Sequence, residues 1–194
     1  LCGHGTVVGG ILLDGGRFDW SEAARFPELN QPYAGFHGMV FAEESTDGAF
    51  LLRARREGLR DFGACMSPHT AWLMLQGLET LPLRMARHVE NTRKVVAFLA
   101  AHPMVAAVGY PELEGHPSHA LAQRLLPRGC GAVFSFDLKG SRRQGVAFIE
   151  ALKIFSHLAN VGDARSLVIH PASTTHFRMD DAALAQAGIG PGTI

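Results

Sequence analysis

The segment Ser156–His176, with the sequence SHLANVGDARSLVIHPASTTH, carries the densest group of side chains that could bind or transform a small molecule. Its polar residues flank a short apolar run on both sides: Asn160, Asp163, Arg165, Ser166, Ser173, Thr174 and Thr175. Amide, guanidinium and hydroxyl groups on loops at the ends of a strand are typical of binding sites. The same residue types also cap helices and stabilise turns. Spacing alone therefore leaves both roles open, a binding site and local turn chemistry.

A glycine-rich segment, LCGHGTVVGGILLDGG, occupies residues 1–16. A P-loop would end in Lys followed by Ser or Thr, and a dinucleotide fingerprint would follow a strand and open a helix. This segment contains no lysine, and the glycines of its first part, GHGTVVGG, precede an apolar run instead of following one. A nucleotide site is therefore disfavoured. The glycines favour a close approach of the backbone to another group.

The histidines raise the question of a metal site. The closest pairs along the sequence are His116 with His119 and His170 with His176. Neither pair has an acidic residue at the spacing of a metal motif such as HExxH. We therefore expect no metal site and interpret these side chains as hydrogen-bonded loop histidines.

The stretch CMSPH, residues 65–69, places a thiol, a hydroxyl and an imidazole close together. A Cys–His nucleophile is chemically conceivable there, but no orienting acid follows at a characteristic distance. Ser67 directly precedes Pro68, an order that is typical of a helix N-terminus. The pattern favours a helix cap over a nucleophile.

Composition limits the classes of partner. The 194 residues carry 18 basic and 18 acidic side chains, so no electrostatic attraction to nucleic acid or anionic lipid is expected. The three cysteines are odd in number and widely spaced, which argues against a disulfide framework and favours a reducing compartment. No apolar run reaches the roughly 18 residues of a membrane span, and the first residues do not resemble a signal peptide. These features predict a cytoplasmic protein without nucleic-acid or membrane partners.

The elements that must position these residues alternate between strands and helices, which predicts an α/β fold. Residues 6–14 read as a buried strand, residues 50–62 as a helix, and residues 67–103 as a long helix kinked at Pro82. Further along, the sequence predicts strands at 105–108, 131–138 and 167–170, and helices at 117–126, 141–152 and 179–188.

Three segments, residues 3–20, 67–99 and 152–176, together resemble the Cys/Met-metabolism family of pyridoxal-phosphate (PLP) enzymes. They are GHGTVVGGILLDGGRFDW, SPHTAWLMLQGLETLPLRMARHVENTRKVVAFL and LKIFSHLANVGDARSLVIHPASTTH. The third segment resembles the O-acetylhomoserine sulfhydrylase branch, since lyases of the family usually carry a Ser-Leu-Gly version of it. Residues 17–62 also resemble an insertion typical of that branch.

The resemblance implies fold type I, the aminotransferase-like α/β architecture, and a homotetramer. Residues 1–82 would form the C-terminal part of the large PLP-binding domain, and residues 83–194 most of the small C-terminal α/β domain. The implied reaction is PLP-dependent γ-replacement on O-acetyl-L-homoserine with sulfide or methanethiol, giving homocysteine or methionine. Three alternatives remain open: a γ-lyase, an O-succinylhomoserine enzyme, and an inactive fragment without catalytic function.

The resemblance also implies roles for single residues near the cofactor. In the family, a lysine that holds PLP as a Schiff base would stand two positions before Leu1. Gly3 and His4 would then lie close to the cofactor, with backbone contact favoured over histidine catalysis. None of the three lysines of the sequence follows the Ser-x-Thr motif of that lysine. No catalytic residue is therefore assigned within residues 1–194, and the isolated chain is expected to be inactive.

Two further positions match the substrate side of the family's pocket. Asn160 corresponds to a residue that hydrogen-bonds the α-carboxylate of the substrate, beside an arginine expected just after Ile194. Thr175 corresponds to a residue that lines the same pocket. An amide donor next to an arginine is a chemically suitable pair for a carboxylate.

Overall fold

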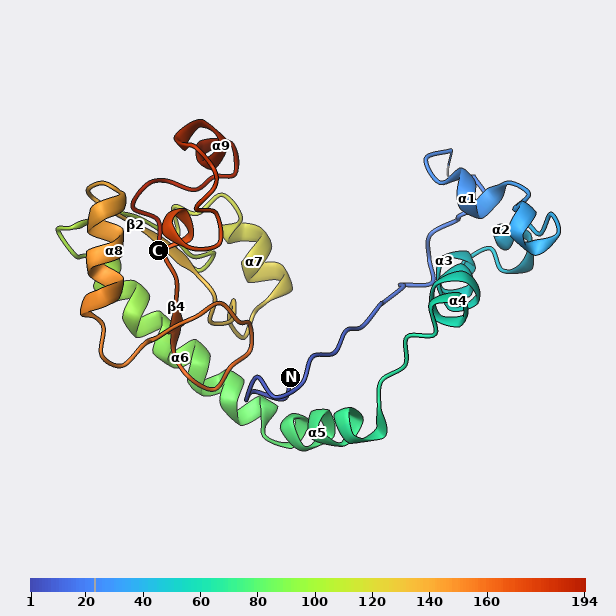
Figure 1. The fold of residues 1–194 in the computed structure, drawn as a ribbon, viewed down its shortest axis with the longest axis horizontal. Coiled ribbons are helices and arrows are strands. Elements are labelled where there is room, and N and C mark those ends of the chain that lie inside the picture. Colours follow the sequence, from blue (N-terminus) through green and yellow to red (C-terminus); the bar gives the residue numbers. More distant parts are fainter. Residues whose placement is uncertain (23) are drawn as a thin grey trace. The chain divides into compact units, whose positions relative to one another are not determined.

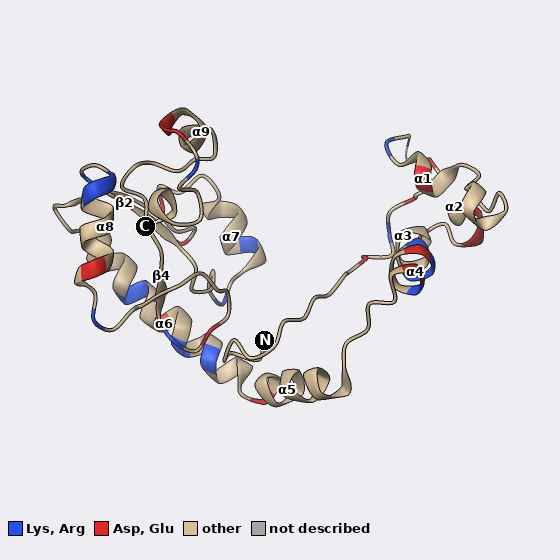
Figure 2. Ribbon diagram, in the orientation of Figure 1, with Lys and Arg blue, Asp and Glu red and all other residues tan. Residues whose placement is uncertain are grey.

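The computed structural model describes residues 1–22 and 24–194 (Figure 1). Its contacts divide the chain into two compact units, one made of Leu1–Val7 with Leu73–Ile194 and the other of Val8–Trp72. The expected domain boundary near residue 82 falls within the first unit, and the assignment of 1–82 and 83–194 to two domains stays a prediction. Acidic and basic residues are interspersed in each unit (Figure 2). In the described part of the chain, no helix is both long and apolar enough to cross a bilayer.

Two helices, α5 (Pro68–Glu79) and α6 (Leu81–Ala100), replace the single kinked helix that the sequence predicts. One residue separates them, because Pro82 stands in the first turn of α6, where its missing N–H interrupts no helical hydrogen bond. The predicted cap of α5 is confirmed, since the Ser67 hydroxyl accepts the backbone N–H of Thr70 at 3.1 Å.

The sheet of the first unit pairs β1 (Val105–Gly109) with β2 (Ser135–Leu138) in antiparallel register. The C-terminal residues extend this sheet alongside β2, because Ile194 and Phe136 exchange two backbone hydrogen bonds of 2.8 and 3.1 Å. Helices α6 and α8 (Arg142–Ala151) contribute to the same core as the sheet. Its buried members are Leu99, Phe136, Ile149 and Ile194.

The remaining elements of the first unit are short. They are α7 (His119–Leu125), the parallel pair β3 (Ser156–His157) and β4 (Leu167–Val168), the 3-10 turn η3 (Pro171–Ser173), and α9 (Asp181–Gln186). The strands β1, β2 and β4 and the helices α7, α8 and α9 confirm the segments predicted after residue 103. The predicted strand at 131–138 is limited to the four residues of β2.

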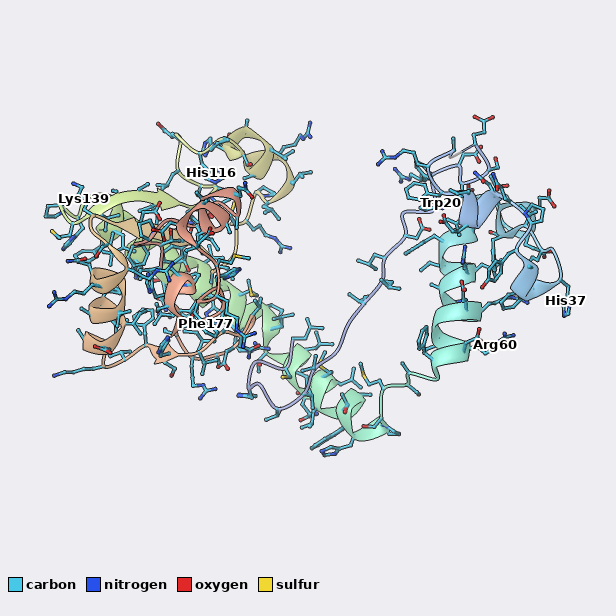
Figure 3. The ribbon with its side chains drawn as sticks, turned by 45° about the horizontal axis from the view of Figure 1, so that its top comes forward. Trp20, His37, Arg60, His116, Lys139 and Phe177 are labelled. Carbon is cyan, nitrogen blue, oxygen red and sulfur yellow. The ribbon has the colours of Figure 1, made fainter. Side chains whose placement is uncertain are left out.

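Short helical segments build the second unit. They are α1 (Pro27–Asn30), η1 (Ala34–Phe36), α2 (Phe41–Glu44), α3 (Ala49–Arg53), η2 (Ala54–Leu59) and α4 (Arg60–Phe62). The segments α3, η2 and α4 are contiguous and form one helix with π-helical bonding in η2. They confirm the helix predicted at 50–62. Trp20, labelled in Figure 3, lies in this unit, and its ring packs against Phe26 and Phe50, with centroids 5.4 and 5.7 Å away. Aromatic packing therefore supplies much of this unit's core.

The predicted buried strand at residues 6–14 is wrong. These residues have no regular secondary structure, and Val8 and Leu13 are 92% and 81% exposed. A strand needs a neighbour for its backbone hydrogen bonds. Within residues 1–22 and 24–194, none of the strands pairs with this run.

Glycine at position 77 allows the segment Leu1–Val7 to lie against α5. A Cβ at Gly77 would stand 2.4 Å from Cys2 Cα and 2.8 Å from the Leu1 carbonyl oxygen. Both neighbours are backbone atoms, so they cannot rotate away. We expect Gly77→Ala to lower the free energy of unfolding of the isolated chain by about 1–3 kcal/mol, measured by urea denaturation. Gly115→Ala, where a Cβ meets open space, is the control; equal stability of the two variants would contradict this packing.

Candidate functional site

Arg84 holds the segment Leu1–Val7 at the junction of α5 and α6. Its Nη2 donates to the carbonyl oxygens of Leu1 and Gly77, at 2.8 and 2.5 Å, and its Nε donates to Thr80 Oγ1 at 3.2 Å. These partners come from two distant parts of the chain. No local pattern in the sequence indicates this role, because a carbonyl oxygen is available at every residue.

The loop Asn160–Arg165 contacts the same segment through its backbone. The N–H of Ala164 donates to the carbonyl oxygen of Gly3 at 2.7 Å. Gly3 itself is buried, with φ of +82°, a conformation that favours glycine. This hydrogen bond joins the two regions for which the family resemblance predicts contacts with the cofactor and with the substrate.

Side chains of the loop approach the segment at Gly5. A Cβ at Gly5 would lie 3.5 Å from Asn160 Nδ2 and 3.7 Å from Asp163 Oδ2. Asn160 and His4 are both exposed. Three of the four predicted site residues, Gly3, His4 and Asn160, therefore lie in one region of the first unit.

Within the described part of the chain, no hydrogen bond joins Thr175 to this group. It is exposed, and its Oγ1 lies 2.8 Å from Nδ1 of the neighbouring His176. The turn before it is fixed by His170, a fully buried ring. The two ring nitrogens of His170 lie 2.8 Å from Ser173 Oγ and 2.9 Å from the Pro191 carbonyl oxygen.

Asp163 is the buried charge of the loop, with only 2% of its side chain exposed. Three N–H groups of Arg165 donate to its carboxylate. The backbone N–H and the Nε–H donate to Oδ1, at 2.8 and 3.2 Å, and Nη2 donates to Oδ2 at 3.1 Å. Hydrogen bonding by the Arg165 side chain is the main cause that lowers the pKa of Asp163 to about 2.

A depressed pKa predicts how the stability of the isolated chain depends on pH. An aspartate with an ordinary pKa of 3.8 and a folded pKa of about 2 stabilises the folded state fully above the higher value. The stabilisation is lost as the pH falls toward the lower value. We therefore expect the difference in free energy of unfolding between the unsubstituted chain and Asp163→Asn to shrink as the pH falls through this window. A constant difference in acid urea denaturation series would contradict the ionised, hydrogen-bonded carboxylate.

A thiol in the same segment is also perturbed. Cys2 is buried, and hydrogen bonding from the His4 backbone is the main cause that lowers its pKa to about 7. Its Sγ lies 3.8 Å from the Val7 carbonyl oxygen. No motif in the sequence distinguishes this cysteine from the other two.

The histidine pairs serve as ordinary hydrogen-bonding groups. His116 Nδ1 accepts the N–H of Ser118 at 3.1 Å, and His119 Nδ1 lies 3.1 Å from the Pro111 carbonyl oxygen. Across residues 1–22 and 24–194, no three His, Cys, Asp or Glu residues are grouped as a metal would require.

The residues at this site fit the edge of a PLP enzyme's pocket. The region offers an exposed amide beside a glycine backbone with positive φ, which suits close contact with a flat ring and a carboxylate. Two of the three lysine amines have other partners: Lys94 Nζ donates to Glu90 at 2.7 Å, and Lys139 Nζ donates to the Pro103 carbonyl oxygen at 2.7 Å. The third lysine, Lys153, follows the end of α8.

A family model described as Cys/Met metabolism PLP-dependent enzyme matches residues 1–194. The chain belongs to this family. Among its relatives, homocysteine synthase of Schizosaccharomyces pombe is 49% identical over 188 residues, covering 96% of the chain and 44% of the relative. O-acetyl-L-homoserine sulfhydrylase 1 of Thermus thermophilus is 48% identical over 189 residues, covering 97% of the chain and 45% of the relative. The chain thus spans less than half the length of these curated relatives.

Solved structures agree with this family assignment. A Campylobacter jejuni protein described as an O-acetylhomoserine (thiol)-lyase, with a pyridoxyl-lysine phosphate, matches with a TM-score of 0.74 and 35% identity. The match covers 89% of the chain and 41% of that protein. Cystathionine γ-synthase from Xanthomonas oryzae matches with a TM-score of 0.64 and 37% identity, over 80% of the chain and 38% of that protein. The resemblance drawn from the sequence and the fold class, α/β of PLP-dependent fold type I, are confirmed.

Proposed function

We propose that residues 1–194 are part of an O-acetylhomoserine sulfhydrylase. The complete enzyme replaces the acetoxy group of O-acetyl-L-homoserine by sulfide or methanethiol, which forms homocysteine or methionine and releases acetate. Relatives with sulfhydrylase or homocysteine synthase names support this branch. The structural observation that carries the proposal is the hydrogen bond from the Ala164 N–H to the Gly3 carbonyl oxygen. It joins the loop with the expected substrate contact, Asn160–Arg165, to the segment with the expected cofactor contact.

In this proposal, Asn160 binds the α-carboxylate of the substrate. Its exposed amide can donate an N–H to a carboxylate oxygen, and a donor to a charged acceptor forms a strong hydrogen bond. Thr175 lines the same pocket, and the arginine expected beyond Ile194 supplies the second donor. A single hydrogen bond from the Asn160 amide leaves the carboxylate free to rotate about that bond. A second donor, the arginine, fixes the plane of the carboxylate group.

PLP, when bound, supplies an electron sink for negative charge at the substrate Cα. Gly3 and His4 contribute backbone at the cofactor side, with Gly3 fixed by the Ala164 N–H and by the Arg84 contact to Leu1. Their role is to position the chain next to the cofactor. The amine that moves protons at Cα and Cβ belongs to a lysine outside residues 1–194 in this account.

The wider properties of the complete enzyme belong to the same proposal. Residues 1–82 form the end of its large domain and residues 83–194 most of its small domain. It is a cytoplasmic homo-oligomer that acts on small molecules. The three cysteines support the reducing compartment, since all of them are free thiols in the structure.

The test uses an extended chain, defined as residues 1–194 together with the preceding and following segments translated from the same coding sequence. Incubated with PLP, O-acetyl-L-homoserine and sulfide, the extended chain should form homocysteine and acetate in equal amounts, detected by mass spectrometry. O-succinyl-L-homoserine replaces the substrate in a second arm, and L-methionine without sulfide in a third. A preference for either of these arms would contradict the assignment and favour the succinyl enzyme or the γ-lyase.

A further inference from the structure

We propose that Arg84 is a positioning residue for the cofactor lysine. Its guanidinium fixes the backbone that follows this lysine, and thereby the direction from which the amine reaches the substrate. This inference rests on the proposed function, in which the lysine stands two positions before Leu1. Arg84 belongs to α6 and acts through the backbone of Leu1, which its guanidinium contacts.

The hydrogen bonds of Arg84, called the Arg84 clamp below, join Leu1 to the end of α5. Nη2 donates to the carbonyl oxygens of Leu1 and Gly77, and Nε donates to Thr80 Oγ1. Gly77 lies in the last turn of α5, where carbonyl groups lack a partner within the helix and attract a positive charge. The end of α5 therefore holds the guanidinium in place, and the guanidinium holds Leu1.

Two glycines allow the segment to fit against the clamp. A Cβ at Gly3 would stand 2.6 Å from Arg84 Nη1, and a Cβ at Gly77 would stand 2.4 Å from Cys2 Cα. Gly3 also has a φ of +82°, which side-chain-bearing residues rarely adopt. Close packing and the hydrogen bonds of Arg84 thus restrain the same short stretch of backbone.

The clamp places the start of the segment beside the loop with the expected substrate contact. A Cβ at Gly162 would lie 3.6 Å from the backbone nitrogen of Leu1, the atom to which the preceding residue is bonded in the extended chain. Two residues span at most about 7 Å of backbone, so a displacement of Leu1 also displaces a lysine two positions earlier. Arg84 therefore sets where the amine stands relative to the loop of Asn160.

Amide exchange tests the clamp without turnover, in the extended chain without PLP. The Ala164 N–H donates to the Gly3 carbonyl oxygen, so it exchanges when the segment leaves the loop. In Arg84→Gln, we expect the hydrogen–deuterium exchange rate of this N–H, resolved by fragmentation mass spectrometry, to rise at least about tenfold. Exchange at Val96, a buried residue of α6, should stay within about twofold, because its hydrogen bond lies within the helix.

A second arginine of α6 provides the matched control. Arg87 is 71% exposed, and its Nε lies 3.7 Å from Glu90 Oε2. Arg87→Gln removes the same charge from the same helix and should leave the exchange at Ala164 unchanged. Arg84→Lys covers the case in which Arg84→Gln does not fold. It keeps the charge and the helix propensity, but a single ammonium cannot replace the planar guanidinium, so exchange at Ala164 should still rise.

The kinetic test uses the extended chain loaded with PLP. We expect Arg84→Gln to lower kcat about 10- to 100-fold, because a reacting group displaced by about 1 Å loses rate on this scale. The KM for O-acetyl-L-homoserine should change less than about threefold, because Asn160 belongs to a different loop. This is the opposite of the pattern expected for a residue that binds the substrate carboxylate.

Three results would overturn the proposal. The first is an unchanged exchange rate at Ala164 in Arg84→Gln and Arg84→Lys. The second is an equal rise at Ala164 and Val96, which a general loss of stability would produce. The third is a kcat of Arg84→Gln equal to that of Arg87→Gln.

Trapping of PLP with borohydride covers the case in which the proposed function fails. The amount of PLP fixed on the lysine before Leu1 after a short incubation should be lower in Arg84→Gln than in the unsubstituted extended chain. If the unsubstituted chain traps PLP there but forms no homocysteine, the proposed function alone is refuted, and the trapped amounts still decide the role of Arg84. PLP trapped on another lysine, or not at all, would overturn this inference.

Discussion

The isolated chain, residues 1–194, is expected to form no homocysteine from O-acetyl-L-homoserine and sulfide, even with PLP in excess. The reaction needs an amine that moves protons at the substrate, and such general acid–base catalysis contributes about 10²–10⁴-fold in rate. None of the three lysines of residues 1–194 follows the Ser-x-Thr motif of the family's cofactor lysine, and two of them, Lys94 and Lys139, donate to Glu90 and to the Pro103 carbonyl. Mass spectrometry of the products over several hours measures the rate.

The extended chain, assayed in parallel, is the control for this first prediction. It should be active under the same conditions, and free PLP without protein gives the background. Homocysteine formation by the isolated chain above that background would contradict the assignment of the catalytic amine to another segment.

Substitution of Asn160 should have the second large effect. In the extended chain, Asn160→Ala removes the amide donor proposed for the substrate carboxylate, a hydrogen bond to a charged group of about 1.5–3 kcal/mol. This energy corresponds to an increase of about 10- to 100-fold in the KM for O-acetyl-L-homoserine. The KM for sulfide should stay within about twofold, because sulfide has no carboxylate to bind. Initial rates at varied concentrations of each substrate measure both constants.

A neighbouring substitution controls for damage to the loop. Val161→Ala removes an exposed side chain, 79% exposed, and keeps the backbone N–H that Asn160 Oδ1 accepts. It should leave both KM values unchanged. If Val161→Ala and Asn160→Ala raise the KM equally, the loop conformation and not the amide is responsible.

Elements with strong local signals were predictable from the sequence. Ser67 followed by Pro68 marked the start of α5, and the apolar spacing after Pro82 marked α6, because capping and helical periodicity depend on residues within one or two turns. The helix predicted at 141–152 is α8, whose N-cap is Ser141, with a capping box completed by Gln144. These signals need no knowledge of the rest of the fold.

Residues 6–14 illustrate what local signals miss. Their β-branched and apolar composition predicted a strand, but a strand forms only beside a partner that the local sequence does not specify. In the structure this run is irregular, and Val8 is almost fully exposed. The composition of residues 6–14 therefore indicates a high propensity for a strand, but it does not show whether a strand forms.

The candidate site was partly predictable. The sequence marked the polar loop around Asn160 and the glycines around Gly3, and the structure joins them by the hydrogen bond from Ala164. The roles of Arg84 and Asp163 required the fold, because the first binds carbonyl oxygens distant in sequence and the second is distinguished only by burial and by its partners. Residue type alone could not separate Asp163 from the other polar residues of its loop.

The location of the cofactor lysine tests the central claim most directly. The extended chain, loaded with PLP and reduced with borohydride, keeps the cofactor on the lysine that bound it, and peptide mass spectrometry then identifies that residue. We expect the pyridoxyl group on a lysine shortly before Leu1, in a peptide that continues into the Gly3 segment. A pyridoxyl group on Lys94, Lys139 or Lys153 would contradict the account.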